Sequence, residues 1–515
     1  MAVVNLVTTV SILGVFVLLA HQIFSYLRSP LRKLPGPRIA KFTNLWRLKT
    51  HYDRTHVETQ IDLHAKYGDV VQLGPNVVSV ANPNMIKTIY STRGTFPKSE
   101  FYSVNDAMQP DGTIVENIFG TRNNEFHSRQ IRPIQKMYSL QSAQKLEPVL
   151  DNTFDVLCRE LERQFMDGKN EGKTCDIADW VLFFAWDFLG DVTFSQRFGF
   201  IEAGEDVGGM LDTAERVMRY FSVVGQIPTF DKLLAKNRYF PFKFPDFSGA
   251  AGFCVERFSE RMQNFEAMKG NKDFLSGFLQ VQQEYPSVTV HDVIGWLIIN
   301  ILGGADTTAI VMKALFYHIL KSPYTKNTLV TELKAANLTY PPSYASLSGL
   351  PYLSACIKEG LRMHPVIGQI AERVVPLSSP GLTIPYPHPD SDTSVTLPPG
   401  TIVGMNPWVV HRQAATFGSR PDDFIPERWM QGYVAGEGVQ EWEGRVKRMT
   451  AADMSFGNGN RTCLGRPLAL VELYKLVATL FGKYEIELED PNQEWELHKQ
   501  WFVWPHKIRV QMRPH

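Results

Sequence analysis

Three long apolar runs stand out in the hydropathy pattern, and each predicts a helix. Residues Ala2–Leu27 contain no Lys, Arg, Asp or Glu and are rich in Val, Leu, Ile and Phe. About 20 apolar residues cross the core of a bilayer, so this run predicts a transmembrane helix. The second run, Val293–Leu302, continues toward Met312 and predicts a buried helix because it is apolar on all sides. The third run, Pro467–Leu476, predicts a leucine-rich helix near the C-terminus.

The residues after the first run set the expected orientation and the domain boundaries. Arg28, Arg32 and Lys33 follow it directly, so the positive-inside rule leaves the rest of the chain in the cytosol. The Leu-Pro-Gly-Pro segment at 34–37 predicts a stiff lead-in, because proline fixes φ and restrains its predecessor. A cleaved signal peptide is the alternative, and it would need a positive n-region and a small-residue cleavage site. We expect a transmembrane anchor over residues 1–27, a basic, proline-rich linker over 28–45 and one large domain over 46–515.

Composition excludes several classes of protein. With 44% hydrophobic and 21% charged residues, the chain is typical of a globular protein. Its formal net charge is zero, so nothing indicates a nucleic-acid partner. The five cysteines are scattered without a CxxC or CxxCH pattern. This spacing excludes the usual zinc pattern and covalent attachment of a c-type haem, and it fits a reducing compartment.

Cys463 lies in a glycine-punctuated loop that suits the binding of a flat, anionic metal cofactor. Glycines let the backbone turn tightly and approach such a group closely. Arg461 offers a fork of donors to a carboxylate, and the helix after the loop would aim its positive end at the sulfur. A thiolate beside a carboxylate-binding arginine is what a haem iron with propionates requires. A buried structural cysteine in a tight turn is the alternative interpretation.

The second apolar run contains a polar interruption with two glycines, an acid and two threonines. Gly303 and Gly304 precede Asp306, Thr307 and Thr308, and this composition is poor for a helix interior. Threonine can also hydrogen-bond to a carbonyl one turn earlier. The segment therefore predicts a local break that would open a groove, with a kinked core helix as the alternative.

Glu359 and Arg362 lie three residues apart on a predicted helix, so their side chains can form an ion pair. This spacing alone is expected by chance in a chain of this length. It gains weight only if a further arginine, such as Arg428, joins the pair.

Together these motifs resemble those of the cytochrome P-450 superfamily, in the family's order along the chain. The loop matches the pattern Phe-Gly-x-Gly-x-Arg-x-Cys-x-Gly at Phe456, Gly457, Gly459, Arg461, Cys463 and Gly465. The other motifs are residues 303–308, 359–362 and 426–429. The likeness runs from about residue 35 to the end. It is similar to fungal microsomal members of the pisatin-demethylase and benzoate-hydroxylase kind, through segments such as 404–411. The implied fold is mainly α with small β-sheets (α+β), after one N-terminal transmembrane helix.

The resemblance implies a role for each residue that matches a family motif. Cys463 would be the axial ligand of haem b, and Phe456, Gly457, Gly459 and Gly465 would shape the cofactor loop. Asp306 and Thr307 would serve oxygen binding and proton delivery, with Thr308 in support. Structural support would come from a buried triad of Glu359, Arg362 and Arg428.

The haem propionates would be held by Arg461 and by Arg373, which lies on a strand after the Glu359 helix. The family's third contact is a Trp or His followed four residues later by Arg. His127 matches its first part, but position 131 is Ile. Either the helix register shifts to recruit Arg132, or this contact is lost.

The implied activity is a membrane-bound monooxygenase that uses O2 to oxidise an apolar organic substrate. Gly457-x-Gly459 lacks the other features of a dinucleotide fingerprint, so electrons would come from an NADPH-dependent flavoprotein reductase, with cytochrome b5 as a further donor. Arg445, Lys447 and Arg448 could dock this reductase, or simply form a solvated charged face. The expected location is the endoplasmic reticulum membrane, single-pass, with the catalytic domain in the cytosol.

Two rival functions remain open at this point. One is a haem-thiolate isomerase or dehydratase that consumes no external dioxygen, and the other is a non-catalytic haem-binding sensor. The first would not require the acid–threonine pair, and the second could dispense with a shaped distal pocket and a reductase. Candidate substrate contacts lie in five aromatic and aliphatic segments, and fungal relatives of this type commonly serve secondary metabolism. The segments are 114–119, 221–227, 299–305, 366–370 and 501–503.

Overall fold

The computed structural model describes residues 22–109, 111–268, 270–385 and 394–515, with isolated positions between 9 and 20. Most of the predicted anchor at 1–27 lies outside the described residues. Among the described ones, α15 (Val290–Lys321) is the helix long and apolar enough to cross a membrane. More than half of its most apolar window is buried within the protein, so α15 is a core helix, as its sequence predicted.

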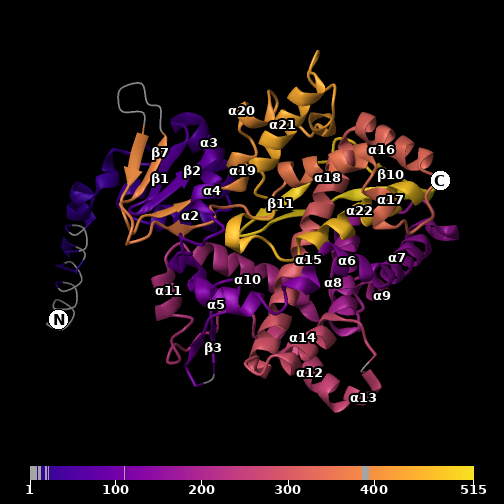
Figure 1. The fold of residues 1–515 in the computed structure, drawn as a ribbon, viewed down its shortest axis with the longest axis horizontal. Helices are drawn as coiled ribbons and strands as arrows, with labels where there is room; N and C mark the ends of the chain where they lie inside the picture. The colour runs from indigo at the N-terminus through magenta and orange to yellow at the C-terminus, as the bar shows by residue number, and fades with distance from the viewer. Residues whose placement is uncertain are drawn as a thin grey trace.

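The fold is mainly helical with small sheets, which confirms the predicted class. Within the described residues, the helices of eight or more residues are α2 (Leu45–Tyr52), α3 (His56–Tyr67), α5 (Asn124–Ile131), α7 (Glu147–Leu161), α8 (Ile177–Phe194), α10 (Met210–Val224), α12 (Ser248–Gln263), α14 (Phe274–Glu284), α15, α16 (Pro323–Ala335), α18 (Pro351–Met363), α21 (Val439–Ala451) and α22 (Arg466–Lys483). In Figure 1 the long helices gather on the side of the C-terminus, and β1, β2, α2 and α3 lie on the side of the N-terminus.

The strands form small sheets that join distant parts of the sequence. The four-stranded sheet has the order β1 (Val70–Gly74), β2 (Val77–Val80), β9 (Ile402–Gly404), β6 (Arg373–Val374), and the three-stranded sheet has the order β10 (Tyr484–Leu488), β13 (Arg509–Pro514), β5 (Cys175–Asp176). Two-stranded sheets are β3 (Ala107–Met108) with β4 (Ile114–Val115), β7 (Leu382–Pro385) with β8 (Ser394–Leu397), and β11 (Glu496–Lys499) with β12 (Val503–His506). In the first sheet β6, which begins at Arg373, lies beside β9.

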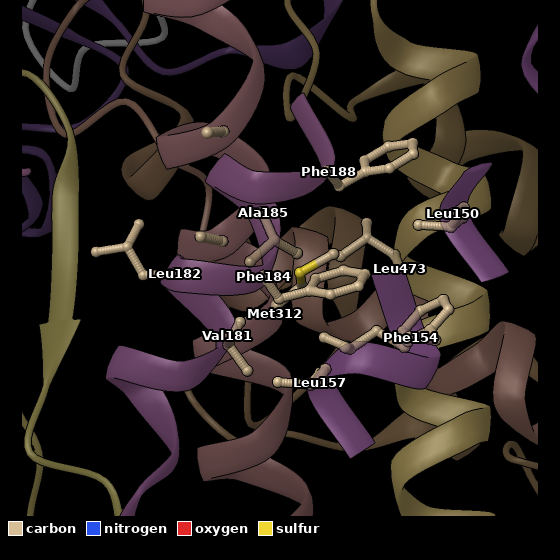
Figure 2. Packing of buried hydrophobic residues seen from close by; sticks show 14 of the residues in the cluster. Leu150, Phe154, Leu157, Val181, Leu182, Phe184, Ala185, Phe188, Met312 and Leu473 are labelled. Carbon is tan, nitrogen blue, oxygen red and sulfur yellow. The ribbon is translucent and has the colours of Figure 1, made fainter. Parts of the chain in front are cut away.

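The core forms where α8 packs against α15 and α7, and α15 packs against α22. Almost every side chain of α8 is buried, as expected for a helix that is apolar on all sides. Figure 2 shows Phe184 of α8 and Phe154 of α7 close to Met312 of α15 and Leu473 of α22. The rings of Phe154 and Phe184 stack with centroids 4.5 Å apart. This packing fixes α15 and α22, the two helices that bear on the site.

The predicted break in α15 is wrong, because the helix runs without interruption from Val290 to Lys321. The Thr307 hydroxyl donates to the Gly303 carbonyl at 2.6 Å, and the Thr308 hydroxyl donates to the Gly304 carbonyl at 3.0 Å. Gly304 also allows close approach of α8, since a Cβ there would lie 2.7 Å from Leu189 Cδ1. Tertiary packing therefore outweighs the low helix propensity of the glycines.

Candidate active site

The loop that ends at Cys463 has a backbone that glycine makes possible. Gly457 and Gly459 have φ of +68° and +71°, a region that other residues rarely adopt. A Cβ on Gly459 would lie 2.1 Å from the Tyr90 carbonyl oxygen. The Cys463 amide donates to the Phe456 carbonyl at 2.8 Å and closes the loop. The glycine pattern thus fixes the backbone that presents the thiol.

The Cys463 sulfur lies at the N-terminus of α22 and accepts hydrogen bonds from two backbone amides. The amides of Gly465 and Arg466 lower the pKa of the thiol, but burial raises it by more. The side chain is nevertheless exposed, whereas the other four cysteines are buried. Protein therefore surrounds the sulfur and still leaves its surface accessible. The predicted meeting of helix N-terminus and sulfur is found.

The polar segment of α15 places its acid and its first threonine in different surroundings. Gly303 is exposed and Thr307 half-buried, although both lie in a core helix. Asp306 is buried and accepts a hydrogen bond from the Trp186 indole at 3.0 Å. Burial raises the pKa of Asp306 to about 6, and the Trp186 N–H acts against that rise. Thr308 is buried, so Thr307 is the accessible hydroxyl of the pair.

Glu359, Arg362 and Arg428 form the predicted buried triad. The Glu359 carboxylate accepts from Arg362 Nε at 2.9 Å and Nη2 at 2.7 Å, and from Arg428 Nε at 3.2 Å. The Trp429 indole and the Ile425 amide each donate to it at 2.9 Å. All three triad side chains are almost fully buried. Such a network is expensive to break, because removing one member leaves a buried charge unpaired.

His411 connects the triad to the cysteine loop. Its Nδ1 donates to the Arg362 carbonyl at 3.0 Å, and its Nε2 accepts from the Met454 amide at 2.8 Å. Burial lowers the pKa of His411 to about 4, which keeps the ring neutral as this pattern requires. The Ser455 hydroxyl donates to the Leu361 carbonyl at 3.0 Å. The backbone just before Phe456 is therefore held from α18.

Arg461 and Arg373 approach each other in a cluster that also contains Lys98 and His127. Lys98 is buried and forms an isolated antiparallel bridge with Arg373, so the two side chains leave the backbone on the same side. The charges of Arg373 and Arg461, together with burial as the larger cause, hold the pKa of Lys98 well below its usual range. Burial, Arg461 and Lys98 lower the pKa of His127 to about 3. The two arginines therefore supply the positive charge of the cluster, and the charged forms of Lys98 and His127 are disfavoured there.

The side chains of Arg132 and His127 point in different directions from α5. α5 is regular up to Ile131, with Arg132 in helical conformation after it, so no register shift occurs. Ile131 packs against the hydrophobic core, and Arg132 is exposed at the helix end. Positions five apart on a helix point about 140° from each other. The structure therefore brings Lys98, and not Arg132, to the cationic cluster.

The residues present fit a haem. One accessible thiol with two amides can ligate an iron, and cations grouped at the loop suit propionates. Sequence reasoning missed Lys98, which carries no motif, and Trp186, which meets Asp306 from another helix. His411 ends the family-like segment 404–411, but its role could not be inferred from the sequence.

Arg445 is unsuited to docking a partner, which corrects one part of the reductase hypothesis. Its guanidinium pairs with Glu437 at 2.6 Å and donates to the Met430 carbonyl at 3.1 Å, with an 11% exposed side chain. Lys447 and Arg448 are exposed.

Comparisons with known proteins agree with this geometry. The model of the cytochrome P450 family matches residues 34–511. The cytochrome P450 monooxygenase asR2 of Sarocladium schorii is 37% identical, over 94% of this chain and 92% of the relative. The cytochrome P450 monooxygenase pkfB of Emericella nidulans is 39% identical, over 89% and 87%, and cfoH of Aspergillus candidus is 33% identical, over 98% and 92%. This chain therefore belongs to the cytochrome P450 family and is a P450 monooxygenase.

Proposed function

We propose that this chain is a membrane-anchored monooxygenase that binds haem b through Cys463 and oxidises an apolar organic substrate in fungal secondary metabolism. The observation that carries the proposal is the accessible Cys463 thiol at the N-terminus of α22. Electrons come from an NADPH-dependent flavoprotein reductase, with cytochrome b5 as a second donor. Residues 1–27 anchor the chain in the endoplasmic reticulum membrane, and the linker 28–45 leads to the catalytic domain, 46–515, in the cytosol. Relatives of fungal origin support this setting, and a kinship with pisatin demethylase or benzoate hydroxylase belongs to the same proposal.

The chain's residues divide the tasks at the site. When bound, haem supplies one-electron and dioxygen chemistry. Cys463 would ligate its iron, Arg461, Arg373 and Lys98 would hold its propionates, and the loop glycines would let the backbone approach it closely. Asp306 holds a proton where α15 meets Trp186, and the next residue, Thr307, has an accessible hydroxyl whose pairing with the Gly303 carbonyl fixes its position.

An aromatic cluster forms the proposed substrate contact surface. The Trp501 ring lies 4.9 Å from that of Phe221 and 6.1 Å from that of Phe119. Phe101 and Tyr102 complete the cluster, and Ile310 of α15, one turn after Thr307, packs with it. Val366 and Ile367 also pack against it, so four of the five predicted segments converge here. Such a surface favours an apolar, ring-containing substrate.

The rival functions lack support from this geometry. An isomerase, dehydratase or sensor has no need of a buried carboxyl with a raised pKa beside an accessible threonine. Asp306 and Thr307 provide that arrangement on α15.

The first prediction tests the activity itself. The reduced enzyme with carbon monoxide should show the thiolate-ligated spectrum, and NADPH, reductase and O2 should yield product from metabolites that accumulate in a strain lacking the protein. Cys463→Ser should lose both signals because it removes the thiolate. Product formation that continues without O2 would favour the isomerase, and a normal spectrum without any turnover would favour the sensor.

The second prediction concerns the triad. Glu359→Ala leaves Arg362 and Arg428 buried without their carboxylate, which costs about 3–5 kcal/mol of stability. We expect the purified variant to contain no haem, measured as the ratio of haem to protein. Glu443→Ala, an exposed change on α21, is the control and should load normally. A fully loaded Glu359→Ala protein would refute the supporting role.

The third prediction separates the two candidate propionate contacts. Lys98→Met removes a charged donor, so haem affinity should fall roughly 10- to 100-fold. Arg132→Met should leave it unchanged, because Arg132 is exposed at the end of α5. Haem transfer to apomyoglobin measures both. If Arg132→Met is the variant that releases haem faster, the assignment to Lys98 is wrong.

The fourth prediction concerns the acid on α15. With a pKa of about 6, Asp306 is protonated and able to donate below that pH and is a carboxylate above it, so coupled product formation should fall as pH rises through about 6. Trp186→Phe removes a hydrogen bond to the carboxylate and should move this midpoint up by roughly 1 pH unit.

Two further variants complete this test. Trp180→Phe, a buried change on α8 whose ring packs against Phe165 and Phe183, should leave the midpoint in place. Asp306→Asn should remove the pH dependence and lower the coupled rate by roughly 100-fold or more. An unmoved midpoint in Trp186→Phe would show that Asp306 does not set it.

A further inference from the structure

A second group of metal-ligating side chains lies outside the haem site, where α10 meets the β11–β12 hairpin. Glu215 of α10, His498 of β11 and His506 of β12 offer ligand atoms that all lie within 4.8 Å of one another. In the antiparallel register His506 is opposite Glu496, and His498 is two residues from Glu496 along the strand. Side chains two apart share a face, so the hairpin presents both imidazoles to α10.

The ligand atoms already converge on one carboxylate. His498 Nδ1 lies 2.6 Å from Glu215 Oε1, and His506 Nε2 lies 3.5 Å from Glu215 Oε2. The two imidazole rings are 4.2 Å apart. His506 Nε2 is a buried atom that has no hydrogen-bond partner among the described residues. An unpaired ring nitrogen beside a carboxylate and a second imidazole is unusual, because buried polar atoms nearly always find a partner.

Neighbouring side chains orient the ligands as outer-shell groups orient metal ligands. Glu496 Oε1 lies 3.0 Å from His498 Nε2 and accepts a hydrogen bond from it, so the ring nitrogen that faces Glu215 and could bind a metal is Nδ1. Gln500 donates to Glu215 Oε1 at 3.1 Å. A histidine that binds metal through one nitrogen and a carboxylate through the other is a recurrent arrangement.

We propose that Glu215, His498 and His506 bind a divalent transition-metal ion, with Zn²⁺ as the reference ion. Two imidazoles and a carboxylate form a ligand set that zinc uses in proteins, with the fourth position left to water. Mg²⁺ and Ca²⁺ prefer oxygen ligands, so this set selects against them.

The surrounding charges set the conditions for binding. Burial, the largest cause, lowers the pKa of His506 to about 4, so this imidazole is neutral and ready to ligate at neutral pH. The hydrogen bond that His498 donates to the Glu215 carboxylate raises the pKa of His498, so a proton competes with the metal there and is released on binding. Arg54 and Lys313 add positive charge nearby, and the two carboxylates of Glu215 and Glu496 oppose it.

Metal binding would join two elements that also carry the aromatic cluster. α10 bears Phe221, and Trp501 lies in the turn between β11 and β12. A metal crosslink would hold α10 and the hairpin together and slow the separation of these two rings. This consequence rests on the proposed substrate role of the cluster, whereas the metal site does not.

The test measures zinc binding to the holoenzyme after treatment with a chelator. Isothermal titration at pH 7.5 should show one Zn²⁺ per chain, and the zinc X-ray absorption spectrum should show two imidazoles with no sulfur. Mg²⁺ should neither bind nor compete. A sulfur shell, or a spectrum with fewer than two imidazoles, would overturn the assignment.

Variants locate the site. His506→Asn and His498→Gln should each weaken zinc binding at least 10-fold, and Glu496→Gln should weaken it roughly 10- to 100-fold through the outer shell. His291→Gln, an exposed change at the start of α15, is the control and should bind as the wild type does. The carbon monoxide spectrum without zinc verifies that each variant is folded.

Different results would reject the metal site and its effect on substrate binding. Unchanged zinc affinity in His506→Asn and His498→Gln would overturn the site, whatever the activity. With the site intact, zinc should slow substrate binding in the wild type and not in His506→Asn. Equal substrate binding rates with and without zinc would reject the crosslink's effect on the cluster and leave the metal site standing.

Discussion

The buried carboxylate of Glu359 is the constraint on which the geometry of the site depends. It accepts hydrogen bonds from two guanidiniums, an indole and a backbone amide, and these donors compensate its buried negative charge. Through Arg362 and His411 it reaches the backbone of Met454, just before the cysteine loop. A buried ion network stabilises a fold little compared with apolar packing. Its value here is positional, because it relates α18, the segment around Arg428 and the cysteine loop to one another.

Burial then opposes the charged form at each reactive group of the site. It raises the pKa of the Cys463 thiol and of the Asp306 carboxyl, and it lowers that of Lys98. The fold supplies partial compensation through the two amides at the sulfur and the indole at Asp306. The charged forms that burial still disfavours would be stabilised by a ligand that brings a cation to the thiol and anions to Lys98, Arg373 and Arg461. The same low dielectric that makes these groups expensive would strengthen their interactions with such a ligand.

Much of this site was predictable because its motifs are local. The positive φ angles of Gly457 and Gly459 can be inferred from residue type alone, whereas the close approach of Gly459 to the Tyr90 carbonyl could not. Lys98 could not be found in this way, since it meets Arg373 only through a bridge between distant segments. The predicted break in α15 failed for a related reason. Glycine propensity is a local quantity, and the packing of α8 together with the threonine hydroxyls outweighed it. The mainly helical class with small sheets followed from the family resemblance, whereas the order of strands in each sheet did not.

The contact of α10 with the β11–β12 hairpin shows how one interface can serve two purposes. On one part of it Phe221 and Trp501 form an apolar contact, and on another Glu215 meets two histidines. The apolar contact tolerates sliding, because dispersion between rings depends weakly on direction. The histidine–carboxylate group does not, because ligand bonds require fixed distances and angles. The position of the hairpin relative to α10 is therefore loosely set by the rings and sharply set by the polar group. A substrate that must separate the rings works against the polar group, and the occupancy of that group by a proton or a metal decides how strongly it resists.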